Sequence, residues 1–216
     1  MGNFFGLDSP FTRFGNILSD ILILSFLWIF CSLPLFTIGA STTALYYTTT
    51  KIVTDRDGYI FKDFFKSFKR DFLKATGAWL LILLITFIIY STLVNMDFIS
   101  ETIPILNGFI RTVYISMLVL FFIELCMFTV FVFPILSRFE LSFKSLLATS
   151  LFMANRHLLT TVLCFALFAA IFFIGVFVLP FILLVSMGIY AYLSSWLLVR
   201  AFKKYKPEID DGNKII

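Results

Sequence analysis

The chain has few of the residues on which catalysis usually depends. It holds one histidine, His157, and three cysteines, Cys31, Cys126 and Cys164, with no CxxC pair. These counts argue against a histidine-rich metal site and a disulfide framework, and cysteines within apolar stretches are typical of small buried hydrophobic residues. The motifs HExxH and GxxxxGK[ST] are missing, so any ATP-driven step needs a partner protein.

Charged residues are also scarce. They make up 14% of the 216 residues, against 60% hydrophobic residues and 30 phenylalanines. A chain of this length cannot hide so much apolar surface in one soluble domain, so lipid is its expected main solvent. The net charge is +4, and the charged residues lie beside the apolar segments. This position indicates a basic membrane face and no nucleic-acid partner.

Five apolar stretches reach the length needed to cross a bilayer, about 20 residues. We expect them at residues 21–38, 75–96, 112–136, 158–178 and 181–199. The last two belong to one run that would be about 63 Å long as a single helix, so the chain is expected to turn near Leu179–Pro180. The predicted fold is an all-α polytopic membrane bundle, with residues 1–216 forming a single membrane domain.

The basic residues predict the orientation. Fifteen of the seventeen Lys and Arg residues lie in residues 40–74, 137–157 and 200–214, and only Arg13 and Arg111 fall on the other side. The positive-inside rule therefore predicts a cytoplasmic C-terminus and an N-terminus outside. We expect the first span to stay in the protein rather than to be cleaved as a signal peptide, because its start lacks the positive charge of a signal peptide.

Three segments are amphipathic and are expected to form interfacial helices, at residues 41–54, 59–74 and 139–155. In the clearest, 59–74, five phenylalanines share one helical face and basic residues occupy the rest. We expect this helix to lie in the headgroup layer near anionic lipid, and the alternative is docking of a cytosolic partner. The candidate lipid or partner surface consists of Phe61, Lys62, Phe64, Phe65, Lys66, Phe68, Lys69 and Arg70.

Glu124 lies midway through the third span. An ionised carboxylate there costs several kcal/mol, so Glu124 is expected to face the bundle interior, to be protonated or to contact a polar partner. The candidate partners are Tyr90, Ser186, Tyr190 and Ser194. Glu124 either joins two helices structurally or binds a proton, a cation or a sugar hydroxyl in a central cavity.

A small-residue run at Gly39–Ala44 allows two interpretations. Ser41, with His157 as its base, would form the dyad of a membrane hydrolase. We instead expect the run to let helices approach closely, since small side chains and hydroxyl groups favour tight packing in membranes.

Several motifs resemble one bacterial family over almost the whole chain. They are SLPLFTIGA at residues 32–40, ALYY at 44–47, DGYI at 57–60, SRF at 137–139 and YLSSWLLVRAF at 192–202. The chain is similar through these motifs to the YesL family of bacterial membrane proteins. The resemblance implies location in the cytoplasmic membrane and an accessory role beside carbohydrate-uptake systems, without any established catalytic residues.

The combined interpretation is a non-enzymatic accessory subunit or scaffold, with no cofactor, that assists an ABC-type sugar importer. The alternative is a transporter or channel with a polar cavity near Glu124. Five spans are few for a monomeric carrier, so that alternative includes a homo-oligomer.

Overall fold

The computed structural model describes residues 10–54, 58–98, 108–177 and 181–203, and every regular element in these ranges is helical. The elements are α1 (Pro10–Ser32), the 3₁₀ helix η1 (Leu35–Thr37), α2 (Ile38–Val53), α3 (Ile60–Val94), α5 (Phe109–Arg138), α6 (Phe143–Arg156), α7 (Leu158–Phe177) and α8 (Phe181–Lys203). Within the described ranges five helices, α1, α3, α5, α7 and α8, are long and apolar enough to cross a membrane. The predicted all-α membrane fold is confirmed.

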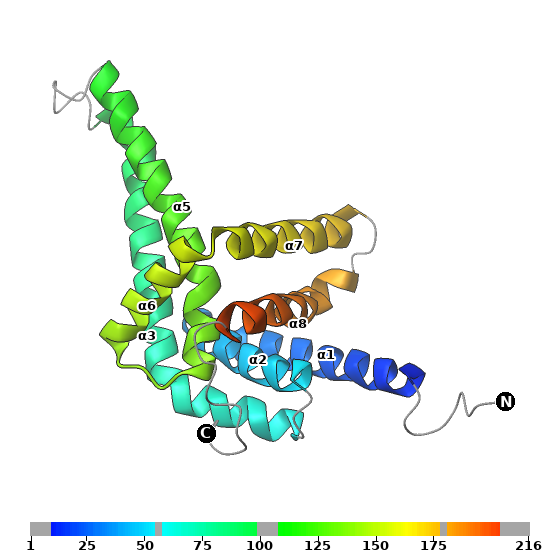
Figure 1. The fold of residues 1–216 in the computed structure, drawn as a ribbon. Helices are drawn as coiled ribbons and strands as arrows, with labels where there is room; N and C mark the ends of the chain where they lie inside the picture. The colour runs from blue at the N-terminus through cyan, green and yellow to red at the C-terminus, as the bar shows by residue number, and fades with distance from the viewer. Residues whose placement is uncertain (1–9, 55–57, 99–107, 178–180, 204–216) are drawn as a thin grey trace.

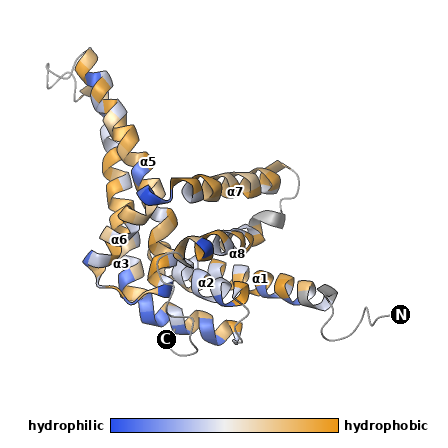
Figure 2. Cartoon of the chain, in the orientation of Figure 1, coloured by the Kyte–Doolittle hydropathy of each residue, from blue (hydrophilic) through white to orange (hydrophobic). Residues whose placement is uncertain are grey.

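The helices form two groups that meet at α2 (Figure 1). In one group α3 and α5 lie side by side, and their far ends extend away from the rest of the protein. In the other, α1, α7 and α8 extend in a different direction, with α8 packed between α1 and α7. Apolar residues cover most of α5 and α7, and polar residues gather where α3 begins (Figure 2).

The first span ends earlier than predicted. Helix α1 stops at Ser32, before η1, rather than continuing to residue 38. Pro34 explains the stop, because proline has no N–H to donate and disfavours helical geometry in the residue before it. The hydroxyl of Thr37 donates to the carbonyl oxygens of Cys31 and Pro34, each at 2.6 Å, and so satisfies acceptors at the helix end.

Helix α2 differs most from the prediction. Residues 41–54 were expected at an interface, but residues 39–49 are all buried between α1, α3, α5 and α8. Hydroxyl side chains make this burial possible, since they donate to carbonyl oxygens one turn back in the same helix. The residues that bond in this way are Ser41, Thr42, Thr43, Thr48 and Thr49.

Gly39 places α2 against α3. A Cβ atom at Gly39 would lie 2.5 Å from the carbonyl oxygen of Ala75 and 2.7 Å from the Cβ of Trp79, so only glycine fits this contact. The indole N–H of Trp79 donates to the carbonyl oxygen of Leu35 at 2.9 Å, which ties η1 to the same helix. The predicted role of the small-residue run in close packing is confirmed.

Helix α3 joins two elements that were predicted separately. The interfacial segment 59–74 and the span 75–96 are one continuous helix from Ile60 to Val94. Its first turns lie beneath α2, and the remainder runs beside α5 (Figure 1). The amphipathic segment is therefore the first part of the same helix that forms a candidate span.

The later helices match the expected order with shifted bounds. Helix α5 begins three residues before the predicted span and continues through Pro134 to Arg138, and the hydroxyl of Ser137 donates to the carbonyl oxygen of Pro134 at 2.7 Å. Helix α6 replaces the interfacial segment 139–155, with the chain extended around residues 139–142. The turn expected near Leu179–Pro180 lies outside the described residues.

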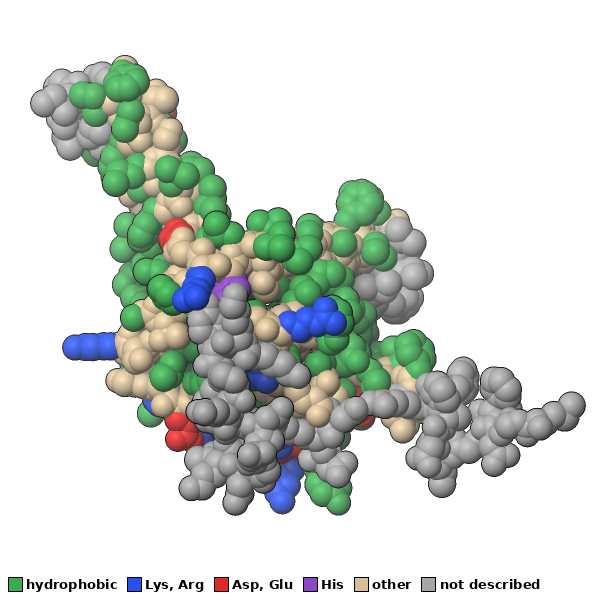
Figure 3. All heavy atoms as spheres, in the orientation of Figure 1, with side chains coloured by type: hydrophobic (Ala, Val, Ile, Leu, Met, Phe, Trp, Pro, Cys, Tyr) green, Lys and Arg blue, Asp and Glu red, His purple; other side chains and the backbone are tan. Residues whose placement is uncertain are grey.

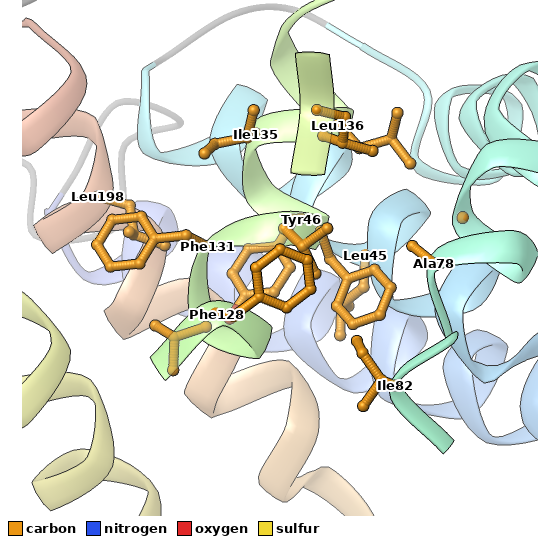
Figure 4. Packing of buried hydrophobic residues seen from close by; sticks show 14 of the residues in the cluster. Leu45, Tyr46, Ala78, Ile82, Phe128, Phe131, Ile135, Leu136 and Leu198 are labelled. Atoms are coloured by element: carbon orange, nitrogen blue, oxygen red, sulfur yellow. The ribbon is translucent and has the colours of Figure 1, made fainter. Parts of the chain in front are cut away.

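The hydrophobic core surrounds α2. Figure 4 shows Leu45 and Tyr46 of α2 meeting Ala78 and Ile82 of α3 and Phe131 of α5. Leu198 of α8 extends the same cluster, and Phe131 is fully buried. We call this region, α2 with the helix segments packed around it, the junction.

Candidate functional site

Glu124 does not meet the partners expected from the sequence. It lies half-buried on α5, and its Oε1 accepts a hydrogen bond of 2.5 Å from Nδ2 of Asn155 near the end of α6. Asn155 also donates to the carbonyl oxygen of Leu151, so its side chain bridges α6 and α5. Glu124 thus links two helices.

The other four candidate residues are divided between two regions. Tyr90 lies on the far part of α3, with an exposed side chain, and Ser186 is half-buried on α8. Tyr190 and Ser194 do come together on α8, where the Ser194 hydroxyl donates to the carbonyl oxygen of Tyr190 at 2.6 Å. Their shared neighbour is Tyr46 of α2, whose hydroxyl lies 3.1 Å from that of Ser194.

Tyr46 and Ser194 belong to a seam of buried hydroxyl groups between α2 and α8. One turn along, Thr49 and Ser195 lie 3.0 Å apart, and all four side chains are buried. Burial raises the pKa of Tyr46 well above its usual range, so its phenol stays protonated and serves as a hydrogen-bonding group. The seam holds helices together and presents no ionised group for acid–base chemistry.

An ion-pair network that the sequence interpretation missed connects α2 to the first turns of α3. Lys51 donates to Asp63 at 2.8 Å, and Arg70 pairs with Asp71 at 2.7 Å. The buried ring of Tyr47 contacts both cations, with Lys51 Nζ at 5.0 Å and the Arg70 guanidinium carbon at 5.2 Å from its centroid. Two cations and two carboxylates leave the network without net charge.

The sequence does carry a signal for this network. Asp63, Ser67 and Asp71 recur every four residues, so they share one face of a helix. All three are buried, and the Ser67 hydroxyl donates to Asp71 at 3.2 Å. Their spacing identifies a polar helix face directed at protein, which the phenylalanine and lysine pattern obscured.

The network changes the titration of Lys51. Burial is the largest single influence and lowers the pKa of the Lys51 ammonium group, but the hydrogen bond to Asp63, the charge of that carboxylate and the contact with Tyr47 together outweigh it. The pKa of Lys51 therefore lies above its usual value of 10.5. The Lys51 ammonium therefore stays protonated throughout the physiological pH range.

The predicted lipid or partner surface is split by the fold. Phe64 is fully buried in the core and Arg70 belongs to the ion-pair network, so neither is available on the surface. Phe68 is half-buried. The exposed members are Phe61, Lys62, Phe65, Lys66 and Lys69.

The hydrolase hypothesis paired Ser41, which lies on α2, with His157, which directly follows α6. Ser41 is fully buried, and its hydroxyl donates to the carbonyl oxygen of Thr37 at 3.1 Å. His157 follows the last residue of α6, and its backbone N–H donates to the carbonyl oxygen of Met153. In the part of the chain that the structure describes, no group of three or more His, Cys, Asp or Glu residues is arranged to hold a metal ion.

Comparison with known proteins adds one match. No curated protein and no solved structure matches the chain. Residues 21–93, about a third of the chain, match the sequence model of one family. That segment covers the second half of α1, all of α2 and nearly all of α3, which includes the ion-pair network. The α1–α3 part of the junction is thus similar to the family described as "Protein of unknown function, DUF624".

Proposed function

We propose that this protein is a non-enzymatic accessory subunit or scaffold of the bacterial cytoplasmic membrane, a YesL-like protein that assists an ABC-type carbohydrate importer. The observation that carries the proposal is the far part of the α3–α5 pair, residues 80–94 and 109–123, which we call the distal arm. Among the residues that the structure describes, it extends from the junction as a pair of helices with no third helix lying along it (Figure 1). A two-helix arm of this kind suits docking against the helices of another membrane protein.

The surface of the distal arm supports a protein partner or lipid. Exposed apolar side chains line both helices, and Phe87 is 67% exposed. Arg111 at the end of the arm pairs with Asp97 at 2.5 Å, which closes the α3–α5 hairpin and neutralises a cation there. Helices in membranes associate through packing and hydrogen bonds, because lipid already solvates their apolar surface.

The junction supports a scaffold role, because it fixes the direction of the arm. Gly39, the Lys51–Asp63 pair and the indole hydrogen bond of Trp79 all fasten α3 to α2 or η1. An arm anchored at its base can present a surface to a partner without large loss of conformational entropy on binding.

Site-specific photo-crosslinking in cells tests the accessory role. A photoreactive phenylalanine at Phe87, on the distal arm, is expected to form an adduct with a membrane subunit of a solute importer. The same group at Phe172, exposed on α7, serves as the matched control and is expected to give no such adduct. An adduct with a second copy of this chain, or none above the control, contradicts the proposal.

Reconstitution separates the accessory role from transport. The purified protein alone in liposomes is expected to take up no labelled sugar. Uptake by the protein alone, lost in Glu124→Gln, would establish the transporter alternative instead.

The proposed orientation places the N-terminus outside and the lysine-rich segments in the cytoplasm. In a background without Cys31, Cys126 and Cys164, Phe98→Cys is expected to react with an impermeant maleimide on intact cells. Arg200→Cys is expected to react only after the cells are permeabilised. The opposite pattern would reverse the orientation.

A further inference from the structure

The first turns of α3 carry a basic surface that the accessory role does not explain. We propose that this surface binds the headgroups of anionic phospholipids. We call it the lysine face and define it by Lys62, Lys66 and Lys69 together with the flanking Phe61 and Phe65. All five side chains are exposed. The proposal is independent of the accessory role, because it requires no protein partner.

The fold sorts the cations of this region into two classes. Lys51 and Arg70 point toward protein and are each paired with a carboxylate. Among the described residues, Lys62, Lys66 and Lys69 have no carboxylate partner. The acidic residues of this helix segment, Asp63 and Asp71, are buried on the opposite face, so the outer face keeps three uncompensated positive charges.

The order of side chains around α3 matches a helix lying along a membrane surface. At about 100° per residue, Phe61 and Phe65 lie within about 40° of each other, and the three lysines fill the adjacent arc of about 60°. The face packed on protein, with Asp63 and Asp71, lies on the far side. The phenylalanine flank can enter the acyl region while the lysines reach the phosphate layer.

The aromatic flank identifies lipid as the occupant in preference to an acidic soluble protein. Phe61 is 57% exposed and Phe65 is 41% exposed, and Leu73 adds an exposed apolar side chain within the arc of the lysines, one turn closer to the span. The segment is continuous with the apolar part of α3, which is long enough to cross a membrane, so its phenylalanines are close to the expected bilayer surface. In Figure 3 basic and hydrophobic side chains occur together along the edge where α3 begins.

Lipid binding to the purified full-length protein tests the charge requirement. Native mass spectrometry in mild detergent is expected to show tighter binding of phosphatidylglycerol than of phosphatidylcholine. The triple variant Lys62→Gln, Lys66→Gln, Lys69→Gln is expected to lose at least about tenfold in affinity for phosphatidylglycerol, because one lysine near an anionic surface contributes about fivefold.

A second triple variant removes the same charge from other helices. Lys144→Gln, Arg156→Gln and Arg200→Gln lie on α6 and α8 and are expected to change phosphatidylglycerol binding less than twofold. Equal losses in the two triple variants would assign the effect to net charge and overturn the proposed site. Equal binding of the two lipids by the unaltered protein would also overturn it. Unchanged thermal unfolding of both variants shows that the fold is intact.

Spin labels on adjacent residues distinguish a membrane surface from a protein-docking surface. In cysteine-free protein reconstituted into phosphatidylglycerol vesicles, a label at Phe65→Cys is expected to be relaxed mainly by oxygen. A label at Lys66→Cys is expected to be relaxed mainly by a water-soluble nickel chelate. If both labels respond to the nickel chelate alone, the face lies in the cytosol and the lipid assignment is wrong.

Discussion

The junction and the distal arm are stabilised in different ways. In the junction, residues 39–49 are buried and hydroxyl groups, ion pairs and a glycine contact join α2 to its neighbours. On the distal arm, large apolar side chains of both helices are exposed, among them Phe87 of α3 and Leu120 of α5. The junction is thus defined by contacts within the chain, whereas the arm depends on whatever surrounds it.

The difference follows from the solvent. In lipid, burying another leucine gains little, because acyl chains are as apolar as the protein interior. Polar groups and close backbone approach therefore distinguish one helix arrangement from another, and both are concentrated in the junction. The following substitutions test this contrast by changing the same residue type in the junction and away from it.

The largest effect is expected from Gly39→Leu. The new side chain would collide with the backbone of Ala75 and with Trp79, so α2 and α3 must separate. We expect a loss of about 3 kcal/mol or more in unfolding free energy, or failure to accumulate in the membrane, measured by thermal unfolding and immunoblotting. Gly15→Leu is the control, since nothing lies within 4 Å of a Cβ at that position. Equal stability of the two variants would contradict the packing role of Gly39.

A smaller loss is expected from Asp63→Asn. The variant leaves Lys51 charged without its carboxylate, and because the pair is partly solvent-exposed we expect a loss of about 1–2 kcal/mol. Hydrogen exchange of the first turns of α3 and thermal unfolding measure it. Asp97→Asn, which breaks the exposed pair with Arg111 on the arm, is the control and is expected to cost less than about 1 kcal/mol.

The same pair predicts a pH dependence. Since folding raises the pKa of Lys51, its contribution to stability is fully present below pH 10.5 and is lost as the pH rises through the folded-state pKa. The difference in unfolding free energy between the unaltered protein and Lys51→Met, measured from pH 8 to about 11, is expected to shrink toward the alkaline end. A constant difference across this range would show that Lys51 acts through packing alone.

Tyr46→Phe is expected to cost about 1 kcal/mol. It removes the phenol that bonds to Ser194 and leaves a buried hydroxyl with one partner fewer. Tyr90→Phe removes the same atom from an exposed ring of the distal arm and is expected to change stability by less than about 0.5 kcal/mol. Comparison of the two melting temperatures measures how much the seam stabilises the fold. Equal values would show that the α2–α8 hydroxyl seam does not contribute to stability.

The smallest effect is expected from Glu124→Gln. Glutamine keeps an oxygen that can accept from Asn155, so assembly and stability are expected to change by less than about 0.5 kcal/mol. Sugar uptake by cells carrying the variant is expected to stay normal. Impaired uptake with normal assembly would show that the carboxylate itself has a function.

Much of the fold could be predicted, and the failures have physical causes. Apolar length identified all five candidate spans, although the first was predicted to reach residue 38 and ends at Ser32. Helix α2 was misjudged because threonine and serine count as polar in a sequence, although they can satisfy their own hydroxyl groups within a helix. Glu124 was expected to meet hydroxyl groups of α8, but Asn155 of a different helix is its partner.

The candidate surface on residues 59–74 was predicted only in part. Periodicity grouped Phe64 with Phe61 and Phe65, but Phe64 lies in the core and the other two are exposed. The regular spacing of Asp63, Ser67 and Asp71 indicates the true buried face in retrospect. Aromatic residues suit lipid and protein interiors equally well, so their spacing alone does not distinguish the two.

Composition and the length of apolar runs are sufficient to establish an all-α chain with five helices able to cross a membrane, because each unbroken apolar run satisfies its own backbone hydrogen bonds as a helix. Which helix lies at the centre, which cations are paired and which lysines remain exposed depend on contacts between residues far apart in the chain. Those contacts are set by the close approach at Gly39 and by the directions of individual hydroxyl and carboxylate groups, which appear only when the helices are packed.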